Sequence, residues 1–555
     1  HMKTLSTLLL FCAAVLQIHA APPPNYSKIW ELFTNSNYTE AQTLIRQELK
    51  NHPNDEALLD LELQIIKNTS DYPKTIEYIR SFIEAAPNPN PFLQSNFELL
   101  SSRTVPSSYE KLVEQTLREL VNHPKLDATM TATLRDELGA LYLSHNDRKK
   151  AEEAYAAIGS VATWSLLGPF ENLMGNGFDK YTDVIENPQQ EVFKGKYNAL
   201  VSWYPLKYHI PGRWIHLENY CYSARGIVFA QTYCTSPIDQ DVYIRIGISG
   251  SLKIFVNDAL VMRENQEINN GIDAMSVKVH LAKGANRIVL QLGNSDANGR
   301  VNFNMRLTDE KFALIQGLTY SHSYAGYPKA VTKAPLPARS IAPYQGYFLA
   351  AAGKKGELEY YYKYKATQVS SYNEDLDYLE EAGSELLEKY PNCSLFYSPL
   401  LNFYTRIGNR TMWSELSERY KKLDPNSLGA VTSRISDAFE KENYPEVSSL
   451  LENYKTVIGN ENYYAFKITL LIKEKKGEEA YALIDVAYNA YPNNTIFVEL
   501  KASMENGDKK NAPAAIEVLS KYLENHYNLK LFGAYFYLKS NIKLESAVDD
   551  LHSLL

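Results

Sequence analysis

Cys393 is the residue of this chain best placed to act as a nucleophile. It follows Pro391 at the expected start of a helix, where the helix dipole lowers the pKa of a thiol. No histidine lies near it in the sequence to serve as a general base. A small, weakly polar residue at a turn between helices usually serves packing. We therefore expect Cys393 to be structural, and we assign no catalytic residue.

Other sequence patterns that carry chemistry are missing or incomplete. The chain holds no HExxH, CxxC or Gly-x-Ser-x-Gly motif, and residues 247–251 (GISGS) have a glycine one place too early. We interpret these residues as a turn between two strands. Residues 175–179 (GNGFD) have too few oxygen ligands for a calcium loop and also read as a turn. The sequence therefore predicts neither a metal nor a cofactor.

Aromatic side chains are concentrated between residues 203 and 222, with polar side chains among them. Flat rings stack on sugars or anchor protein partners, while neighbouring polar groups fix the orientation of a ligand. The alternative is that Trp203 and Trp214 are core residues where a sheet domain meets helices. The candidate binding residues are Trp203, Tyr204, Tyr208, Trp214, His216, Tyr220 and Tyr222.

The three cysteines that follow residue 21 are expected to be free thiols. Cys221 and Cys234 flank residues 224–233 (ARGIVFAQTY), which read as one strand, and eight extended residues cover about 26 Å. A disulfide needs Cα atoms about 4.4–6.8 Å apart, and the few remaining residues cannot fold back that far. The odd count, with Cys393 as the third, also excludes complete pairing within one chain.

Residues 1–21 have the features of a signal peptide. One lysine precedes the apolar run at residues 8–16 (LLLFCAAVL), small residues then suit a signal peptidase, and three prolines stop any helix. The residues before Cys12 do not match a lipoprotein signal. We expect an exported protein, periplasmic, at the cell surface or secreted, with no segment that spans a membrane. The net charge of -8 disfavours nucleic acid as a partner.

Helix breakers recur along the chain at a nearly constant spacing. Apolar-periodic segments end at Pro53 and Pro87, which are 34 residues apart. This period predicts stacked helix pairs, because one pair cannot bury its apolar face without a neighbour. We expect one helical repeat domain at residues 22–157 and another at residues 346–555. The later breakers, 33 or 34 residues apart, are Pro391, Pro425, Gly459, Pro492 and His526.

Between these helical regions the apolar period changes from 3.6 to 2. Segments with one apolar face and short turns predict an antiparallel β-sandwich at residues 158–310, in a multidomain α + β protein. Hairpin turns are expected at residues 257–258 and 283–284, with Ile254 and Val256 facing the core. Four prolines in residues 311–345 fit a linker. The expected strands are residues 242–248, 252–256, 277–281, 288–292 and 301–307.

The helical period resembles that of tetratricopeptide repeats. In the unit that ends at Pro492, the residues Ala480, Ile484 and Ala487 occupy the small, apolar and small positions of that family. One earlier unit departs from the pattern, with Trp413 where a small residue is usual, so we expect looser or re-angled packing there. The resemblance implies stacked helices that bind other proteins, without naming the partner.

The predicted sandwich resembles the galactose-binding-like jelly rolls of bacterial surface enzymes. In that family a strand ending in Asn-Gly is followed by a Lys-Gly-x-Asn turn, which corresponds here to residues 257–258 and 283–286, with Asp258 as the departure. Residues 164–179 (WSLLGPFENLMGNGFD) resemble the entry segment of large exported bacterial proteins. Those proteins combine repeats, this sandwich, more repeats and a transglutaminase-like region, of which the chain shows no trace. The last helix stops before the next expected breaker, so we expect a truncated chain.

We therefore expect an exported, non-catalytic scaffold whose repeats hold a protein partner and whose sandwich sets the angle between the helical regions. A carbohydrate-binding accessory module is the alternative. So is the recognition half of a longer transglutaminase-like protein. An enzyme on this chain is the least favoured hypothesis.

Overall fold

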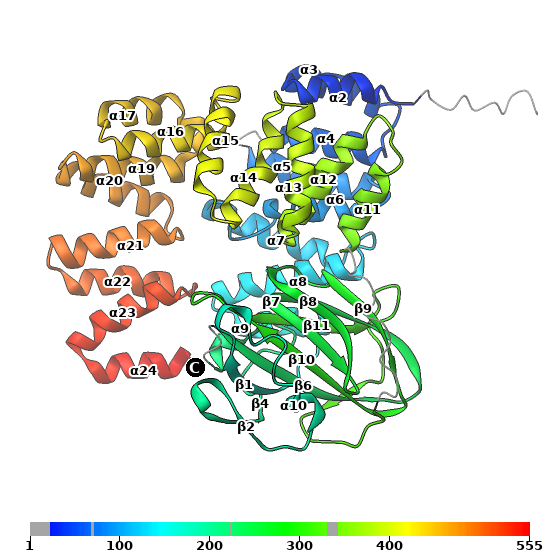
Figure 1. Ribbon diagram of the computed structural model, residues 1–555. Coiled ribbons are helices and arrows are strands. Elements are labelled where there is room, and N and C mark those ends of the chain that lie inside the picture. The colour runs from blue at the N-terminus through cyan, green and yellow to red at the C-terminus, as the bar shows by residue number, and fades with distance from the viewer. Residues whose placement is uncertain (1–22, 68–70, 222–224, 330–341, 555) are drawn as a thin grey trace, which may run out of the picture.

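The protein is a mixed α/β chain in which an antiparallel sheet follows one helical region along the sequence and precedes another (Figure 1). A computed structural model describes residues 23–67, 71–221, 225–329 and 342–554. The expected signal peptide, residues 1–21, lies outside the described residues. Part of the predicted linker, residues 330–341, also lies outside them.

The first helical region runs from α2 to α9. Aspartates stand at several of its helix starts: the side chains of Asp55, Asp71, Asp127 and Asp147 each accept a hydrogen bond from a backbone N–H of the first turn. The helices are α2 (Tyr26–Thr34), α3 (Tyr38–Leu49), α4 (Glu56–Ile66), α5 (Tyr72–Ala85), α6 (Asn90–Ser95), α7 (Glu110–Leu120), α8 (Ala128–Ser144) and α9 (Arg148–Ala156).

The second helical region runs from α11 to α24. Three of its helices end within two residues of the predicted breakers Pro391, Pro425 and Pro492. The helices are α11 (Pro343–Ala352), α12 (Glu359–Tyr372), α13 (Leu376–Lys389), α14 (Tyr397–Arg406), α15 (Arg410–Leu423), α16 (Leu428–Glu440), α17 (Tyr444–Asn453), α18 (Lys455–Ile458), α19 (Asn460–Lys473), α20 (Gly477–Ala490), α21 (Thr495–Ser503), α22 (Ala512–Leu523), α23 (Leu529–Ile542) and α24 (Leu544–Leu554).

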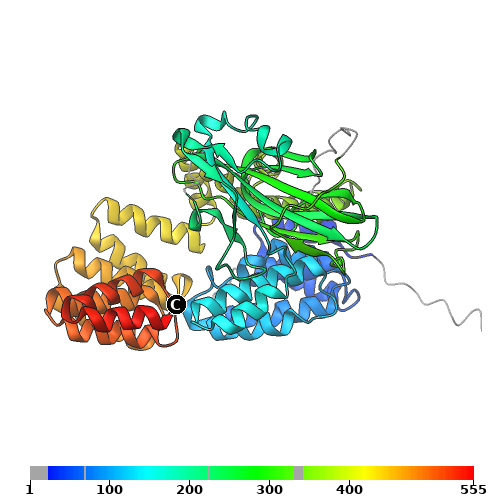
Figure 2. The same ribbon diagram turned by 90° about the horizontal axis from the view of Figure 1, so that it is seen from below.

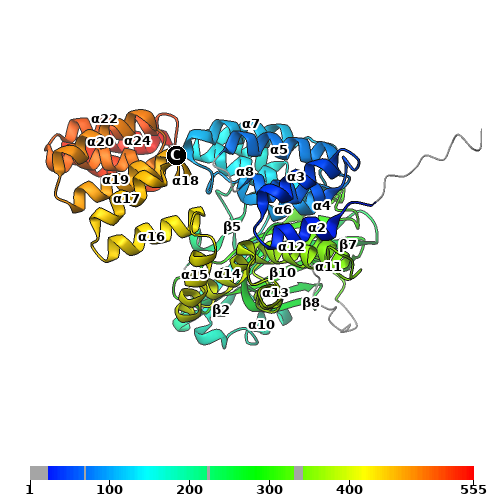
Figure 3. The ribbon, with the colours of Figure 1, turned by 90° about the horizontal axis from the view of Figure 1, so that it is seen from above.

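The two helical regions pack directly against each other. Trp30 of α2 donates a hydrogen bond from Nε1 to the hydroxyl of Tyr390 (3.1 Å), and its ring contacts Tyr361 and Phe396. One apolar core continues from α2–α8 into α11–α15, which lie side by side in Figures 1 and 3. The expectation that the sandwich sets the angle between two separate arms is therefore wrong, because contacts between the helices set it.

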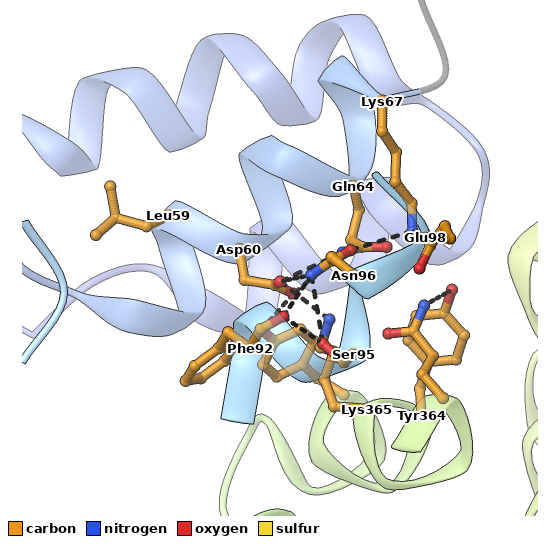
Figure 4. A network of polar contacts seen from close by, with 12 residues as sticks. Leu59, Asp60, Gln64, Lys67, Phe92, Ser95, Asn96, Glu98, Tyr364 and Lys365 are labelled. Atoms are coloured by element: carbon orange, nitrogen blue, oxygen red, sulfur yellow. Dashed lines mark hydrogen bonds and ion pairs between the residues drawn. The ribbon is translucent and has the colours of Figure 1, made fainter. Parts of the chain in front are cut away.

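A buried polar network lies inside this shared helical core (Figure 4). Asp60 and Lys365 are fully buried, and Lys365 Nζ lies 2.9 Å from Asp60 Oδ1. The same carboxylate accepts hydrogen bonds from the Tyr361 hydroxyl (2.8 Å) and from Asn96 Nδ2 (3.0 Å). Buried charges are stable only when they are paired and hydrogen-bonded. The network therefore fixes the position of α12 against α4.

Ten strands of the described chain form one antiparallel sheet, and two more form a hairpin. The β12 strand lies inside the predicted linker and pairs with β6, so the sheet extends past residue 310. The sheet strands are β1 (Ser165–Glu171), β4 (Tyr204–Pro205), β5 (Ile215–His216), β6 (Gly226–Ser236), β7 (Gln240–Val256), β8 (Ala259–Asn269), β9 (Met275–Leu281), β10 (Gly284–Gly293), β11 (Asn302–Thr308) and β12 (Thr319–Ser321); the hairpin is β2 (Val192–Lys194) and β3 (Leu200–Ser202).

The longest strand, β7, corrects the sequence analysis. Residues 247–251, predicted to be a turn, lie inside this continuous strand. The first half of β7 pairs with β9 and β11, and its second half pairs with β8 and β10. These two groups of strands enclose one apolar core. Gly250 lies between the halves at φ 117°, and a Cβ there would be 2.5 Å from the carbonyl oxygen of Gly293. A glycine is therefore required where the strand changes partners.

The predicted turn at residues 257–258 is confirmed, and its unusual second residue has a partner. Asn257 and Asp258 both have positive φ (50° and 72°), as a two-residue hairpin turn requires. The Asp258 carboxylate accepts a hydrogen bond from Nη1 of the fully buried Arg287 (2.9 Å). Asp258 therefore stands in place of glycine because it neutralises a buried guanidinium. Ile254 and Val256 face the core, as predicted.

Candidate functional site

Two neighbouring carboxylates of α8 lie where this helix meets the sheet. Asp136 accepts a hydrogen bond from Nε1 of Trp214 (3.2 Å), which precedes β5. The tip of the Trp214 ring lies so close to Gly247 of β7 that a Cβ there would come within 2.5 Å of Cη2. The glycine in β7 thus makes room for the ring. Asp136 and Trp214 are both partly exposed, so this contact borders solvent.

The electrostatic environment makes Asp136 sensitive to pH near neutrality. Burial and the adjacent Glu137 raise its pKa to about 7, against the opposing effects of Trp214, Arg103 and Arg213. Glu137 differs from its neighbour because Oε1 accepts hydrogen bonds from the backbone N–H and the hydroxyl of Ser102, both at 2.7 Å. The two adjacent carboxylates thus have different hydrogen-bond partners.

Tyr372, the last residue of α12, brings a second aromatic ring to the same place. It lies against Gly271, where a Cβ would be 2.2 Å from Cε1 of the ring, and makes an edge contact with Phe97. Burial, together with the charges of Asp136 and Glu137, raises the pKa of its phenol. Even so, 39% of Tyr372 is exposed. A phenol that remains protonated beside two carboxylates can donate a hydrogen bond to a ligand.

His216 of β5 completes what we call the junction site: Asp136, Glu137, Trp214, His216 and Tyr372. Burial lowers the pKa of the imidazole, and Nδ1 lies 3.6 Å from Oε1 of Glu218. A third of the His216 side chain is exposed. The site thus combines carboxylates, a neutral imidazole and aromatic rings, a set that suits recognition of a polar ligand with flat apolar faces.

The junction is held rigidly by a buried ion pair. Arg306 of β11 donates from Nε to Asp273 Oδ1 (3.0 Å) and also contacts the other carboxylate oxygen, and both residues are buried. The hydroxyl of Thr129 in α8 donates to Asp273 Oδ2 (2.7 Å). The sheet is therefore fastened to the helix that carries the two carboxylates, and the junction site has a fixed geometry.

The predicted aromatic cluster is not one surface. Trp214 and His216 lie at the junction, whereas Trp203 packs half-buried against the apolar cluster that includes Phe193 on the other side of the sheet domain. Tyr204 and Tyr220 pack against the main core of the sheet, with the Tyr204 hydroxyl 3.4 Å from the carbonyl oxygen of Tyr220. Tyr208 is 98% exposed. Tyr222 lies outside the described residues.

The junction residues on the helices were missed by the sequence analysis. Asp136 and Glu137 form an acidic pair in a segment that otherwise reads as an ordinary apolar-periodic helix, which gives no signal of a site. Tyr372 is one of 41 tyrosines, so its residue type does not single it out. Only the contact of Trp214 with α8 identifies these residues, and that contact joins positions 78 residues apart.

The three cysteines in the described chain are free thiols, as predicted. Burial raises the pKa of Cys393 and of Cys234 to about 12 and that of Cys221 to about 11. The backbone N–H groups at the helix start lower the Cys393 value only in part. A buried thiol with so high a pKa is protonated at neutral pH, so the reactive thiolate is not formed.

A scan against protein-family models finds no match for this sequence, and a search of the curated proteins finds none either. Across residues 23–67, 71–221, 225–329 and 342–554, no helix has both the length and the apolar composition that a bilayer crossing requires.

Proposed function

We propose that the protein is an exported, non-catalytic scaffold that binds a protein partner through its second helical region. In this proposal the helices are tetratricopeptide-like repeats and the sheet is a galactose-binding-like sandwich. The regular spacing of helix ends at residues 389, 423 and 490 supports the first assignment. The shared core enclosed by both halves of β7 supports the second. The buried, protonated thiols support a non-catalytic role.

The observation that carries the proposal is the distribution of exposed apolar side chains. Twelve of the twenty-one large apolar side chains exposed in the described chain lie between residues 407 and 544, and none lies in the helices from α2 to α9. Exposed apolar groups concentrated in one region indicate an interaction surface. The twelve are Ile407, Met412, Trp413, Leu428, Ile472, Val486, Ile496, Tyr527, Leu529, Tyr537, Ile542 and Leu544.

Site-specific photo-crosslinking in the exporting cell tests this proposal. A photoreactive side chain at Trp413, Ile472 or Tyr537 is expected to capture one recurrent protein. The same group at the exposed positions Glu40 and Glu77, on the first helical region, is the matched control and is expected to capture none. Equal capture from both regions, or recovery of the isolated chain alone, would refute a partner surface in the second region.

A glycan is the second candidate ligand, and the junction site favours it. The exposed part of Trp214 offers a ring face, and Asp136 and Tyr372 offer polar groups beside it. Binding on a glycan array is expected to be lost on Trp214→Ala and weakened on Asp136→Asn, which preserves the side-chain size. Tyr208→Ala, a change at a solvent-exposed ring far less packed than Trp214, serves as the control. Absence of binding by the unaltered protein would eliminate this candidate.

A further inference from the structure

The end of the second helical region returns to the first (Figures 1 to 3). We call α16–α24 the arc. The backbone N–H of Tyr527, between α22 and α23, donates to the carbonyl oxygen of Ser144 at the end of α8 (2.7 Å). Nearer the middle of the arc, Glu461 accepts hydrogen bonds from the hydroxyls of Ser107 (2.7 Å) and Ser108 (2.8 Å). Besides its covalent connection to α15, the arc is thus held at its middle and at the α22–α23 connection.

The contact between the arc and the first helical region is polar. The apolar core shared by α2–α9 and α11–α15 includes Leu416 of α15 as its last buried member, and the arc starts a separate core at Val431. Hydrogen bonds and charged side chains, rather than a continuous apolar core, therefore join the α22–α23 connection of the arc to α7 and α8.

Three side chains meet at this contact with their ligand atoms close together. His145 caps the end of α8, Glu110 opens α7 and His526 follows α22. Glu110 Oε1 lies 3.2 Å from His145 Nε2, and Glu110 Oε2 lies 3.7 Å from His526 Nε2. All three ligand atoms lie within 4.8 Å of one another. Zn–N and Zn–O bonds of about 2.0–2.1 Å at a tetrahedral angle place ligand atoms about 3.3 Å apart, so only small movements are needed.

Neighbouring side chains hold both imidazoles in place, and that of His145 has the carboxylate partner usual for a metal ligand. His145 Nδ1 lies 3.5 Å from Oε2 of Glu114, one turn along α7 from Glu110. A ligating histidine usually donates its second N–H to a carboxylate, which fixes its tautomer and leaves Nε2 for the metal. The His526 ring stacks on Tyr522, with centroids 4.9 Å apart and an interplanar angle of 22°. The two imidazole rings stand nearly perpendicular, with centroids 5.3 Å apart.

Burial also suits an ion. The side chains of Glu110, His145 and His526 keep 22%, 19% and 13% of their surfaces exposed, so an ion can enter but is largely shielded from water. One carboxylate oxygen and two imidazole nitrogens form a donor set typical of zinc with an open fourth position.

We propose that Glu110, His145 and His526 bind a divalent transition-metal ion of the Zn²⁺ type that clamps the arc to α7 and α8. The three side chains supply one ligand each, Glu114 holds His145 in position, and water fills the remaining coordination position. The ion joins His526 to His145, which lies 381 positions earlier in the chain. This role goes beyond partner binding, because it controls whether the helical regions stay closed.

Zn²⁺ titration by calorimetry of the full chain tests the proposal. We expect one tight site, lost in His145→Ala and in His526→Ala and retained in His123→Ala. His123 is a matched control because it also pairs with a glutamate, at 3.0 Å from Glu84. Glu114→Gln is expected to weaken the site by about 10–100-fold, as the loss of an outer-shell partner does. Co²⁺ bound to the same site should show the absorption bands of a tetrahedral complex.

Hydrogen exchange supplies the structural readout. The Tyr527 amide, which donates to Ser144, should exchange more slowly when Zn²⁺ is added, and this change should vanish in His526→Ala. Circular dichroism of each variant shows whether it remains folded, and Glu110→Gln gives a third variant if one histidine change unfolds the chain. Failure of the full chain to bind Zn²⁺, or equal binding in His123→Ala and His526→Ala, would overturn the proposal.

Discussion

The carboxyl group of Asp136 is expected to make the stability of the protein depend on pH, and Asp136→Asn should remove that dependence. Burial at the junction and the nearby Glu137 raise its pKa to about 7, above its ordinary value of 3.8. The folded protein therefore keeps a proton that the unfolded chain has lost between about pH 4 and pH 7. Asparagine has the same size, and its oxygen can still accept the Trp214 hydrogen bond.

The sign and size of the effect follow from this difference. Because the folded pKa is raised, the contribution of Asp136 to stability is complete below about pH 4 and is lost as the pH rises to about 7. A difference of about three pKa units corresponds to about 4 kcal/mol. Part of Asp136 is exposed, so solvent screening reduces this figure, and we expect about 2 kcal/mol. Asp136→Asn should thus be as stable as the unaltered protein at pH 4 and more stable at pH 8.

Urea unfolding followed by tryptophan fluorescence, at constant salt from pH 4 to pH 8, measures the difference. Glu137→Gln is the control: it leaves Asp136 able to titrate but removes the charge that helps to raise its pKa. In that variant the fall in stability should occur at lower pH. A difference between Asp136→Asn and the unaltered protein that is the same at every pH would refute the raised pKa.

Two further changes test the fold. Lys365→Met should lower the free energy of unfolding by about 3–5 kcal/mol, because it leaves the buried charge of Asp60 unpaired. Adding Asp60→Asn to Lys365→Met should restore more than half of the lost free energy of unfolding, as measured in urea. If the losses of the two single variants simply added, the pairing of Asp60 with Lys365 would be contradicted. Gly250→Ala should lower the thermal midpoint more than Gly284→Ala. Both glycines have positive φ, but only at Gly250 does a new Cβ meet backbone, the carbonyl oxygen of Gly293. If the two variants lost the same amount of thermal midpoint, the positive φ alone, and not the contact with Gly293, would account for the loss.

Sequence periodicity predicts elements well where one chemical signal decides them. Helices end beside Pro391 and Pro492 because proline cannot continue a helix, whatever packs nearby. The error in β7 has a different origin. The core-facing residues keep the same parity from Val242 to Val256, with Gly250 in the place of one of them. In the sequence, Gly250 fits either a turn between two strands or a bend within one strand. The contact with Gly293 of the neighbouring strand, which the sequence does not reveal, shows that it is a bend.

The candidate site depends on contacts that no local pattern contains. An apolar stripe shows that a helix face will be covered, but not which segment covers it. Trp30 packs on Tyr361 and Tyr390, more than 300 residues further along the chain, although Trp30 and Tyr361 lie in ordinary helices and Tyr390 directly follows one. In the same way burial raises the pKa of Asp136 to about 7 at a place where α8 meets a sheet domain that the sequence places in a separate domain. The aromatic cluster predicted two of the junction residues, because tryptophan and histidine stand out by type.

The break in the helical core explains why a metal clamp can matter. Trp413, predicted to loosen the packing of its unit, remains 40% exposed on α15, next to the point where the shared core ends and the arc begins. Beyond that point the arc is held to α8 and to the residues just before α7 by polar contacts, and a hydrogen bond to a charged group such as Glu461 contributes about 1.5–3 kcal/mol. An ion at one hundred times its dissociation constant adds about 2.7 kcal/mol to the state that binds it. Binding at Glu110, His145 and His526 therefore stabilises the closed state about as much as one or two of these hydrogen bonds. The ion can decide whether the arc, which carries most of the exposed apolar side chains, stays closed against the first helical region or opens from it.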